Sequence, residues 1–447
     1  MTLSKTKIFS AGIKKMIARE LASLSPFFEN LIELFPQKHS EQVIYSLVPA
    51  AKKITVFDED DLQKCIANDE SNIFLLDGLL NYASDIQMLL IQVKHILNRD
   101  SRLFVVAYSP YYRWLYKLAN ALHLRQGELP TTFLTKTDLR NLAQLTGYTV
   151  TRIKGTIYFP FTLFGIGYLI NGLLAAIPFI KELAMVQSII LSPQIPCAES
   201  VSLSVVIPAR NEMGNIENAL IGLQNWPHKE KLEIIFVEGH STDDTYQEIL
   251  RVQEKYNSEF NIKVYQQTGK GKSDAVRLGF SQATSELLTI LDADLTVPPS
   301  YLYRFYEAYL AGMADFVNGN RLLYPMEDKA MRPLNRLGNS FFAKALSYVL
   351  DIHIGDSLCG TKLFSRKDYQ RYIAWREVFG DFDPFGDFEL LFPAAILGSS
   401  FVDIPIPYRA RTYGSTNIDR FRHGFMLLKL TTVGFVKVKL NLFNRNH

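Results

Sequence analysis

Cysteine is scarce in this chain, since Cys65, Cys197 and Cys359 are the only three in 447 residues. An odd number of widely separated cysteines argues against the disulfide framework of small secreted domains. No signal peptide is recognised at the start of the chain, and there is no internal repeat or low-complexity tract. We therefore expect a protein of the reducing cytosol, built from two or three domains.

A strong net charge is also missing, because 48 Lys and Arg residues are balanced by 45 Asp and Glu residues, a formal net charge of +3. This balance indicates no particular partner, and we expect no nucleic acid. Residues 155–180 contain no charge at all. Their length would permit a membrane span, but Pro160, Pro178 and several glycines interrupt the run. We expect burial or contact with a membrane surface, and a span stays as the alternative.

Two acidic residues follow an apolar run near the middle of the chain. Residues 287–291 predict a buried strand, and Pro298 and Pro299 prevent its continuation. Asp292 and Asp294 would point to the same side of a strand, where their charges repel unless a cation lies between them. Carboxylate oxygens suit a hard dication that keeps coordination positions for substrate phosphates. The alternative is an ordinary acidic strand-to-loop turn.

Earlier apolar segments also end in polar clusters and are followed by helical patterns. We expect strands at residues 204–207, 232–237 and 262–265, with polar clusters at residues 208–212, 238–245 and 269–275. Alternating strands and helices indicate a parallel sheet. The carboxyl ends of its strands should meet at one crevice. Asn215 could cap a helix over residues 216–224.

Residues 203–420 resemble a family 2 glycosyltransferase with the GT-A fold, nearest the dolichyl- or polyprenyl-phosphate sugar transferases. The motifs that carry the resemblance lie at residues 206–212 (Val-Ile-Pro-Ala-Arg-Asn-Glu), 237–245 (Val-Glu-Gly-His-Ser-Thr-Asp-Asp-Thr), 269–275 (Gly-Lys-Gly-Lys-Ser-Asp-Ala), 292–296 (Asp-Ala-Asp-Leu-Thr), 319–321 (Gly-Asn-Arg), 360–366 (Gly-Thr-Lys-Leu-Phe-Ser-Arg) and 411–416 (Arg-Thr-Tyr-Gly-Ser-Thr). The resemblance implies a UDP- or GDP-sugar donor and a bound Mg²⁺ or Mn²⁺.

The resemblance also implies a role for individual residues. The metal ligands would be Asp292, Asp294 and Thr296. The nucleotide sugar would be bound by Pro208, Arg210, Glu212, Glu238, Lys272, Asp274 and Asp292. The acceptor would be bound by Arg321, Arg336, Arg409 and Ser415, and the catalytic residues would be Asp294, Asp387, Glu389 and Arg411. Ordinary alternatives are helix capping for the acids and solvated surface positions for the basic residues. Relatives often have aspartate where Glu238 stands, so the nucleotide base stays open.

The acceptor determines whether the reaction needs a base. A phosphate monoester, whose second pKa is about 6, is mostly doubly ionised at neutral pH and attacks unaided. A sugar hydroxyl needs a carboxylate to take its proton, and Asp387 or Glu389 could serve. Arg409 and Arg411 favour a phosphate, since a guanidinium binds it through two donors. However, Asn417 stands where polyprenyl-phosphate transferases commonly have lysine, so both acceptors stay open.

The N-terminal part also alternates strands and helices. We expect strands at residues 54–57, 73–76, 103–108 and 186–191, and helices at residues 62–68, 86–97, 112–122 and 137–145. Residues 85–108 and 135–151 resemble the C-terminal half of class I S-adenosylmethionine-dependent methyltransferases. Residues 1–150 contain only four glycines, and none lies in the cofactor-binding turn of that family. We therefore interpret this part as a degenerate, noncatalytic domain.

These observations predict an α/β protein with two Rossmann-like domains. We expect a truncated methyltransferase-like domain at residues 1–198, a GT-A domain with a mostly parallel sheet at residues 199–420, and a basic amphipathic C-terminal helix at residues 421–447. The expected function is an inverting, metal-dependent transfer of sugar to a lipid phosphate at the inner face of a membrane. The alternatives are transfer to a saccharide hydroxyl and a noncatalytic nucleotide-sugar-binding scaffold. Methyl transfer is a third and less favoured function.

Overall fold

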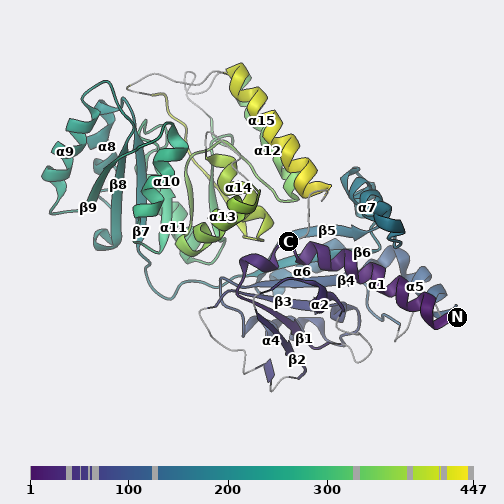
Figure 1. Ribbon diagram of the computed structural model, residues 1–447. Helices are drawn as coiled ribbons and strands as arrows, with labels where there is room; N and C mark the ends of the chain where they lie inside the picture. The colour runs from purple at the N-terminus through teal and green to yellow at the C-terminus, as the bar shows by residue number, and fades with distance from the viewer. Residues whose placement is uncertain are drawn as a thin grey trace.

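A computed structural model describes residues 2–36, 43–50, 52–58, 61–62, 70–122, 129–325, 333–379, 386–411, 413 and 420–440. The strands form two sheets, one in each half of the chain (Figure 1). The N-terminal strands are β1 (Asn30–Leu34), β2 (Lys52–Val56), β3 (Asn72–Asp77), β4 (Arg102–Tyr108), β5 (Tyr148–Ile157) and β6 (Val186–Pro193). The C-terminal strands are β7 (Leu203–Ala209), β8 (Leu232–Glu238), β9 (Asn261–Gln266), β10 (Leu287–Ile290), β11 (Phe316–Asn320), β12 (Lys362–Ser365) and β13 (Phe401–Pro405).

The helices divide between the two halves in the same way. Those of the N-terminal half are α1 (Thr2–Leu21), α2 (Val43–Leu47), α4 (Ile86–Lys94), α5 (Arg113–Ala121), α6 (Lys136–Leu145) and α7 (Ile166–Ala176). Those of the C-terminal half are α8 (Ile216–Ile221), α9 (Thr245–Tyr256), α10 (Lys272–Gln282), α11 (Leu302–Leu310), α12 (Pro333–Leu350), α13 (Arg366–Phe379), α14 (Asp387–Ile396) and α15 (Arg420–Gly434).

The N-terminal sheet has the strand order β2-β1-β3-β4-β6-β5. Its first four strands are parallel, whereas β6 runs antiparallel to both β4 and β5 and lies between them. Successive side chains of a strand point to opposite faces, so Leu31 packs with α1 and α2 while Ile32 packs with α4 and α6. The sheet is therefore covered by helices on both faces.

The C-terminal sheet has the order β13-β11-β12-β10-β7-β8-β9. The parallel alignment of β10, β7, β8 and β9 confirms the parallel sheet expected from the alternating pattern. The sheet as a whole is mixed, because β12 runs antiparallel to β10 and β11. Its two faces are covered by different helices: Val206 packs with α10, α13 and α14, and Val205 packs with α8, α9 and α11.

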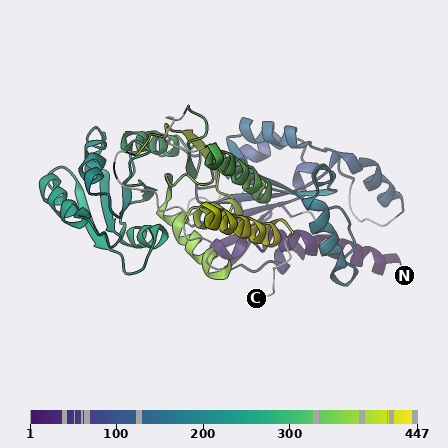
Figure 2. The same ribbon diagram turned by 90° about the horizontal axis from the view of Figure 1, so that it is seen from above.

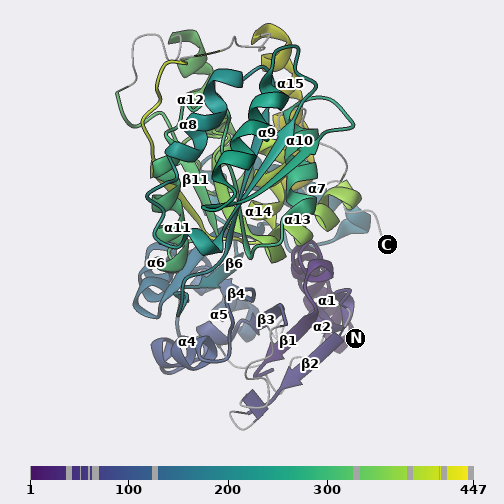
Figure 3. The same cartoon turned by 90° about the vertical axis from the view of Figure 1, so that its left-hand side faces the viewer.

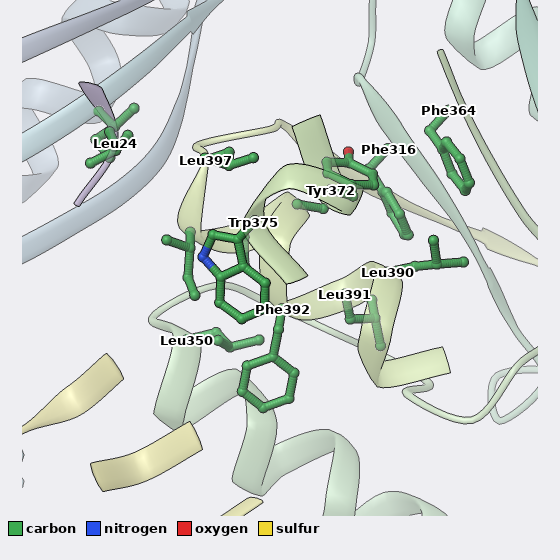
Figure 4. Close-up of a cluster of buried hydrophobic side chains, with 14 of the residues drawn as sticks. Leu24, Phe316, Leu350, Phe364, Tyr372, Trp375, Leu390, Leu391, Phe392 and Leu397 are labelled. Carbon is green, nitrogen blue, oxygen red and sulfur yellow. The ribbon is translucent and has the colours of Figure 1, made fainter. Parts of the chain in front are cut away.

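One hydrophobic core passes from one half of the molecule to the other. It extends from Leu24 in the N-terminal half to Trp375 on α13 and Phe392 on α14. Figure 4 shows these side chains together with Phe316 of β11. The two sheets lie one above the other in Figure 3. The halves are thus packed against each other rather than joined only by residues 194–202.

Several local expectations differ from the structure. The helices expected at residues 86–97 and 216–224 end earlier, at Lys94 and Ile221. Asn215 does not cap α8, because its amide donates to Glu212 Oε2 at 2.7 Å. A short polar side chain can hydrogen-bond to a neighbouring residue instead of capping the helix. Most of the helix expected at residues 62–68 lies outside the described residues.

The uncharged residues 155–180 form the end of β5, a turn and the short helix α7, which covers 11 residues. No helix among the described parts of the chain has the length and apolar character needed to cross a bilayer. The C-terminal helix α15 packs along α12, as the view from above shows (Figure 2).

Candidate active site

Three loops at the carboxyl ends of the parallel strands contain a non-glycine residue with a left-handed backbone. These are Asn211 after β7 (φ 56°), His240 after β8 (φ 55°) and Leu295 after β10 (φ 50°). Such residues are uncommon and concentrate at functional sites. Each of them turns the chain sharply, so that polar side chains of the loop stay beside the end of the sheet.

The first pair of charges at this edge joins Lys272 and Asp292. Lys272 is the first residue of α10, and its Nζ lies 2.5 Å from Asp292 Oδ1. The backbone of Gly360 covers this pair so closely that a Cβ at position 360 would overlap both Lys272 Nζ and Asp292 Oδ2. A glycine is required here because the chain approaches a charged pair without room for a side chain.

The second pair joins Asp294 and Arg411. Arg411 Nη2 lies 2.6 Å from Asp294 Oδ2, and its Nη1 lies 3.9 Å from Glu212 Oε1. The hydroxyl of Thr296 donates to Asp294 Oδ1 at 2.8 Å, and its backbone N–H donates to the same oxygen at 3.1 Å. Asp294 thus receives charge and hydrogen bonds from loops that are far apart in the sequence.

The strand geometry expected for the two aspartates is wrong. Strand β10 ends at Ile290, so Asp292 and Asp294 lie in the turn that follows it. Their repulsion is relieved by separate cations, Lys272 for the first and Arg411 for the second. Both acids nevertheless lie at the edge of the sheet, because they directly follow the carboxyl end of β10.

The surroundings shift the pKa of several groups. Burial would raise the pKa of Asp292, but the Lys272 ammonium outweighs it and holds that pKa below its usual range. Burial would lower the pKa of Lys272, and the charge of Asp292 raises it instead. Burial raises the pKa of Glu212, and the charge of Asp294 adds to the rise. The site is therefore a set of coupled charges rather than independent groups.

The chemistry of these side chains fits a hard dication. Asp292 and Asp294 offer carboxylate oxygens, and both remain partly exposed, at 28% and 10% of the side chain. Mg²⁺ commonly uses one or two carboxylates and completes its shell with substrate phosphates and water. No group of three or more His, Cys, Asp or Glu residues suited to a metal occurs among the described residues. The fit therefore rests on two carboxylates and on ligands that a substrate would bring.

The residues expected to bind the donor line the same edge. Glu238, at the end of β8, is buried and accepts from the backbone N–H of Ser241 at 2.5 Å and from Gln266 Nε2 at 3.3 Å. Pro208 is half-buried on β7, and Arg210 is exposed in the loop after it. Asp274 accepts from the backbone N–H of Gly269 at 3.1 Å, which fixes the loop before α10.

The residues expected to bind the acceptor are not all brought together. Arg321 is buried and binds Asp356 through two hydrogen bonds, Nε–Oδ2 at 2.7 Å and Nη2–Oδ1 at 2.9 Å. The backbone N–H of Arg409 donates to the Thr296 carbonyl at 3.0 Å, while its side chain is exposed. Arg336 lies on an exposed part of α12.

Ser415, expected to bind the acceptor, lies outside the described residues. Burial would lower the pKa of Arg321, but Asp356 raises it well above its ordinary value. Arg321 is therefore a permanently charged, fixed group beside the site.

The two acids of α14 have different partners. Asp387 binds the fully buried Lys362, with Nζ 2.8 Å from Oδ1. Glu389 is bound by Arg277, with Nη2 2.8 Å from Oε2, and also by Arg376. Because two guanidinium groups engage the carboxylate of Glu389, its expected role as a base is poorly supported. Asp387 is the better candidate of the two.

Sequence reasoning missed Lys362 and Asp356 as site residues. Both are fully buried charged residues, Lys362 at the start of β12 and Asp356 in the segment before it, and each holds an expected site residue. The motif at residues 360–366 includes Lys362, a lysine at the start of an apolar strand. Lysine is rarely buried without an acidic partner, so its position could have predicted a buried ion pair. Asp243, which accepts from Tyr413 Oη at 3.2 Å, was also missed as a contact of the segment after Arg411.

The chain is similar in sequence to known glycosyltransferases. Residues 204–373 match the model of the family described as Glycosyl transferase family 2. A dolichyl-phosphate hexose transferase of Haloferax volcanii is 29% identical over 222 residues, covering 50% of this chain and 89% of that protein. A dolichol-phosphate mannosyltransferase of Pyrococcus furiosus is 33% identical over 120 residues, covering 27% of this chain and 33% of that protein.

A solved structure of glucosyl-3-phosphoglycerate synthase from Mycobacterium tuberculosis, in complex with Mn²⁺, UDP-glucose and phosphoglyceric acid, has 17% sequence identity to this chain. The superposition covers 54% of this chain and 80% of that one, with a TM-score of 0.38. A TM-score this low adds no support to an assignment. The family match and the two relatives are the evidence: the chain carries a family 2 glycosyl transferase domain and is a nucleotide-sugar glycosyltransferase.

Proposed function

We propose that this chain is an inverting, metal-dependent glycosyltransferase that moves a sugar from a nucleotide sugar to the phosphate of a polyprenyl-type lipid. The observation that carries the proposal is the pair of acids after β10, Asp292 and Asp294, each facing a cation from another loop. The names of the two relatives, which refer to dolichyl phosphate or dolichol phosphate, favour a lipid phosphate as acceptor.

Asp292 and Asp294 would hold the metal, with the hydroxyl of Thr296 as the neighbouring polar group. When bound, Mg²⁺ or Mn²⁺ would supply positive charge that stabilises the departing diphosphate. The ammonium of Lys272 and the guanidinium of Arg411 would then be released from the acids. Both cations would be free to bind phosphate oxygens, Lys272 on the donor and Arg411 on the acceptor.

When the acceptor is a phosphate, the transfer does not require the protein to accept a proton from it. A phosphate oxygen attacks the anomeric carbon from the side opposite to the leaving group. The bond between that carbon and the diphosphate oxygen breaks as the new bond forms, and its electron pair leaves with the nucleoside diphosphate. Arg411, with Arg321 held by Asp356, would orient the attacking phosphate.

A saccharide hydroxyl is the second candidate acceptor. It is favoured by one observation, the fixed carboxylate of Asp387 beside the buried Lys362. A positioned carboxylate is what a hydroxyl nucleophile needs. The choice of UDP or GDP and of the sugar stays open, because Glu238 is the group expected to read the nucleotide and it replaces the aspartate common in relatives.

The metal requirement is tested by measuring donor hydrolysis and transfer with and without Mg²⁺ or Mn²⁺. Asp292→Asn and Asp294→Asn should each reduce kcat by about a hundredfold or more, because each removes a charged ligand at the leaving group. Glu230→Asn, at an exposed acid far from the site, is the matched control. Turnover that does not depend on metal would contradict the proposal. The absence of turnover with every donor would favour a noncatalytic nucleotide-sugar-binding scaffold.

The acceptor is tested with Asp387→Asn, Glu389→Gln and Arg411→Ala. A phosphate acceptor predicts that Arg411→Ala loses activity while Asp387→Asn and Glu389→Gln keep most of it. A hydroxyl acceptor predicts that Asp387→Asn is the inactive variant. Since Asp387 and Glu389 both hold ion pairs, thermal unfolding of each variant is measured in parallel so that a folding defect is recognised.

The N-terminal half, residues 1–198, would be a methyltransferase-like domain that has lost its chemistry. Its strand order, with an antiparallel strand between β4 and β5, supports this relationship. Its place in the protein would be that of a scaffold, with residues 199–420 as the GT-A domain. Calorimetry of the full chain with S-adenosylmethionine tests this, and tight binding would contradict it.

We also propose that the enzyme acts at the inner face of a membrane, where α15 would contact lipid headgroups.

A further inference from the structure

Helix α7 is packed with its apolar side outward. Its buried residues are Gly167, Asn171 and Ala175, whereas its exposed residues are the large aliphatic ones, Ile166, Leu169, Leu173 and Ile177. Both sets recur every three or four residues, so each forms one stripe of the helix. A surface helix surrounded by water has the opposite arrangement, with its large apolar side chains facing the core.

The outward orientation of α7 is fixed by specific contacts. The amide oxygen of Asn171 accepts from the backbone N–H groups of Tyr158 at 2.7 Å and Phe159 at 2.8 Å. Its Nδ2 donates to the Phe159 carbonyl at 2.8 Å. Gly167 lies against the backbone of Phe161 with no space for a Cβ. A rotation of the helix that buried its aliphatic stripe would break all these contacts.

The turns on either side of α7 also project aromatic rings. Phe164 and Phe179 are almost completely exposed, and their backbones lie in the left-handed region with φ of 54° and 70°. A non-glycine residue in this region is held in a strained backbone conformation. The exposed segment also includes Phe161, Leu163 and Leu183. Apolar groups so close together on a surface mark an interaction site.

Two further helices close to α7, α12 and α15, also expose apolar residues. Tyr348 of α12 donates its hydroxyl hydrogen to the Ala176 carbonyl, and Gly172 lies against the backbone of Leu440. Figure 1 shows α7 near the ends of α12 and α15, which pack together. Exposed apolar residues on these helices are Leu334, Leu337, Phe341, Phe425 and Leu428. We call the exposed apolar residues of the α7 segment, α12 and α15 the docking face.

The charges of these helices all have one sign. Helices α7, α12 and α15 contain no Asp or Glu, and their basic residues include Arg336, Lys344 and Lys429. Glu182, between Phe179 and Leu183, is paired with Lys136 at 2.5 Å. Apolar side chains next to basic residues complement an anionic lipid surface, where apolar groups enter the acyl region and cations bind headgroups. A second copy of this chain would instead bring like charges together.

We infer that the docking face binds an anionic lipid bilayer, with Phe164 and Phe179 inserted into it. This deepens the proposed function and rests on it for its purpose, which is to hold the enzyme where a lipid phosphate is available. It also gives the N-terminal half a task that needs no methyl transfer. Arg336 then serves as a headgroup contact rather than as part of the acceptor site.

The test is co-sedimentation of the full chain with vesicles of phosphatidylcholine mixed with phosphatidylglycerol. The double variant Phe164→Ser/Phe179→Ser should bind at least about tenfold more weakly than the unmodified chain, since two large apolar side chains are lost from the bilayer. Leu145→Ser/Met313→Ser changes two exposed apolar residues outside the docking face and should bind normally. Vesicles of phosphatidylcholine alone should bind less in every case.

A second measurement does not depend on loss of binding. In Phe164→Trp, the new tryptophan should be quenched by brominated lipids on addition of anionic vesicles. Equal vesicle binding by the serine variants, no quenching, or a dimer in light scattering that the serine substitutions abolish would overturn the inference. Transfer to a short-chain, water-dispersed polyprenyl phosphate should be unchanged by Phe164→Ser/Phe179→Ser. The two proposals can fail separately. If the serine variants lose vesicle binding but the unmodified chain shows no metal-dependent turnover, the proposed function is refuted and the docking face is not.

Discussion

At the scale of single residues, the acids of the candidate site carry their own counter-ions. Lys272 neutralises Asp292 and Arg411 neutralises Asp294, so the protein can fold with two neighbouring acids in a turn. Unpaired, these like charges would destabilise the loop. In the proposed mechanism the same pairs would open before a dication and a diphosphate bind. Folding and substrate binding would then compete for the same carboxylates.

This competition leads to a prediction for Lys272→Met. Without the ammonium, Asp292 is free, so Mn²⁺ alone should bind about threefold to tenfold more tightly, while the KM for the nucleotide sugar should rise because a phosphate-binding cation is lost. Calorimetric titration with Mn²⁺ and initial rates against donor concentration measure the two effects. Lys270→Met, an exposed lysine of the same loop, should change neither. Weaker binding of Mn²⁺ by Lys272→Met would show that the lysine does not compete with the metal.

At the scale of secondary-structure elements, two adjacent strands of the N-terminal sheet place carboxylates close together. Glu33 on β1 is 1% exposed, and its Oε2 has no hydrogen-bond partner among the described residues. Burial raises the pKa of Glu33 from 4.5 to about 7, and the charge of Asp77 at the end of β3 adds to the rise. Burial also raises the pKa of Asp77.

The raised pKa of Glu33 predicts how stability depends on pH. Below pH 4.5 the group is protonated in both the folded and the unfolded state, and its contribution to stability is complete. Between pH 4.5 and about 7 the unfolded state is ionised while the folded state still holds the proton, so the free energy of unfolding falls by up to about 3 kcal/mol and levels off above pH 7. Urea unfolding between pH 5 and pH 8 measures this loss. In Glu33→Gln the loss should be much smaller, whereas Glu230→Gln should behave like the unmodified chain.

At the scale of the whole molecule, the two halves are joined by a buried ion cluster around Asp315. Arg102 Nη2 lies 3.0 Å from Asp315 Oδ2, and Arg99 Nε lies 3.4 Å from Asp315 Oδ1. The same carboxylate accepts from the hydroxyls of Ser192 and Ser400. Arg99 also donates to the carbonyls of residues 309 and 314 at 2.9 and 2.8 Å. The cluster connects the N-terminal sheet with the segment before β11.

Asp315→Ala should therefore uncouple the halves. Removing one partner of a buried charge cluster leaves Arg102 unpaired and costs about 3 to 5 kcal/mol. Scanning calorimetry should show a lower Tm, and a single transition should become two as the halves unfold separately. Glu259→Ala, which removes an exposed ion pair with Lys229, should cost less than about 1 kcal/mol. An unchanged transition in Asp315→Ala would mean that the apolar core alone couples the halves.

The sequence by itself determined where the parallel strands of the C-terminal sheet lie and which polar residues follow them. Apolar runs that stop at polar clusters predicted β7, β8, β9 and β10 and the edge at which they end, because strand periodicity and the residues that break it are local properties. The acids Asp292 and Asp294 followed from the same pattern.

Only the tertiary structure decided which charges meet. Glu389 is held by Arg277, 112 residues earlier in the chain, and Asp387 by Lys362. Asn171 turns the aliphatic stripe of α7 outward through its hydrogen bonds to the end of β5. Such pairings depend on how helices and strands are oriented when they pack, and local sequence patterns carry no information about that orientation. Local residue pattern therefore sets the type and order of the elements, while packing selects the partners of each charge.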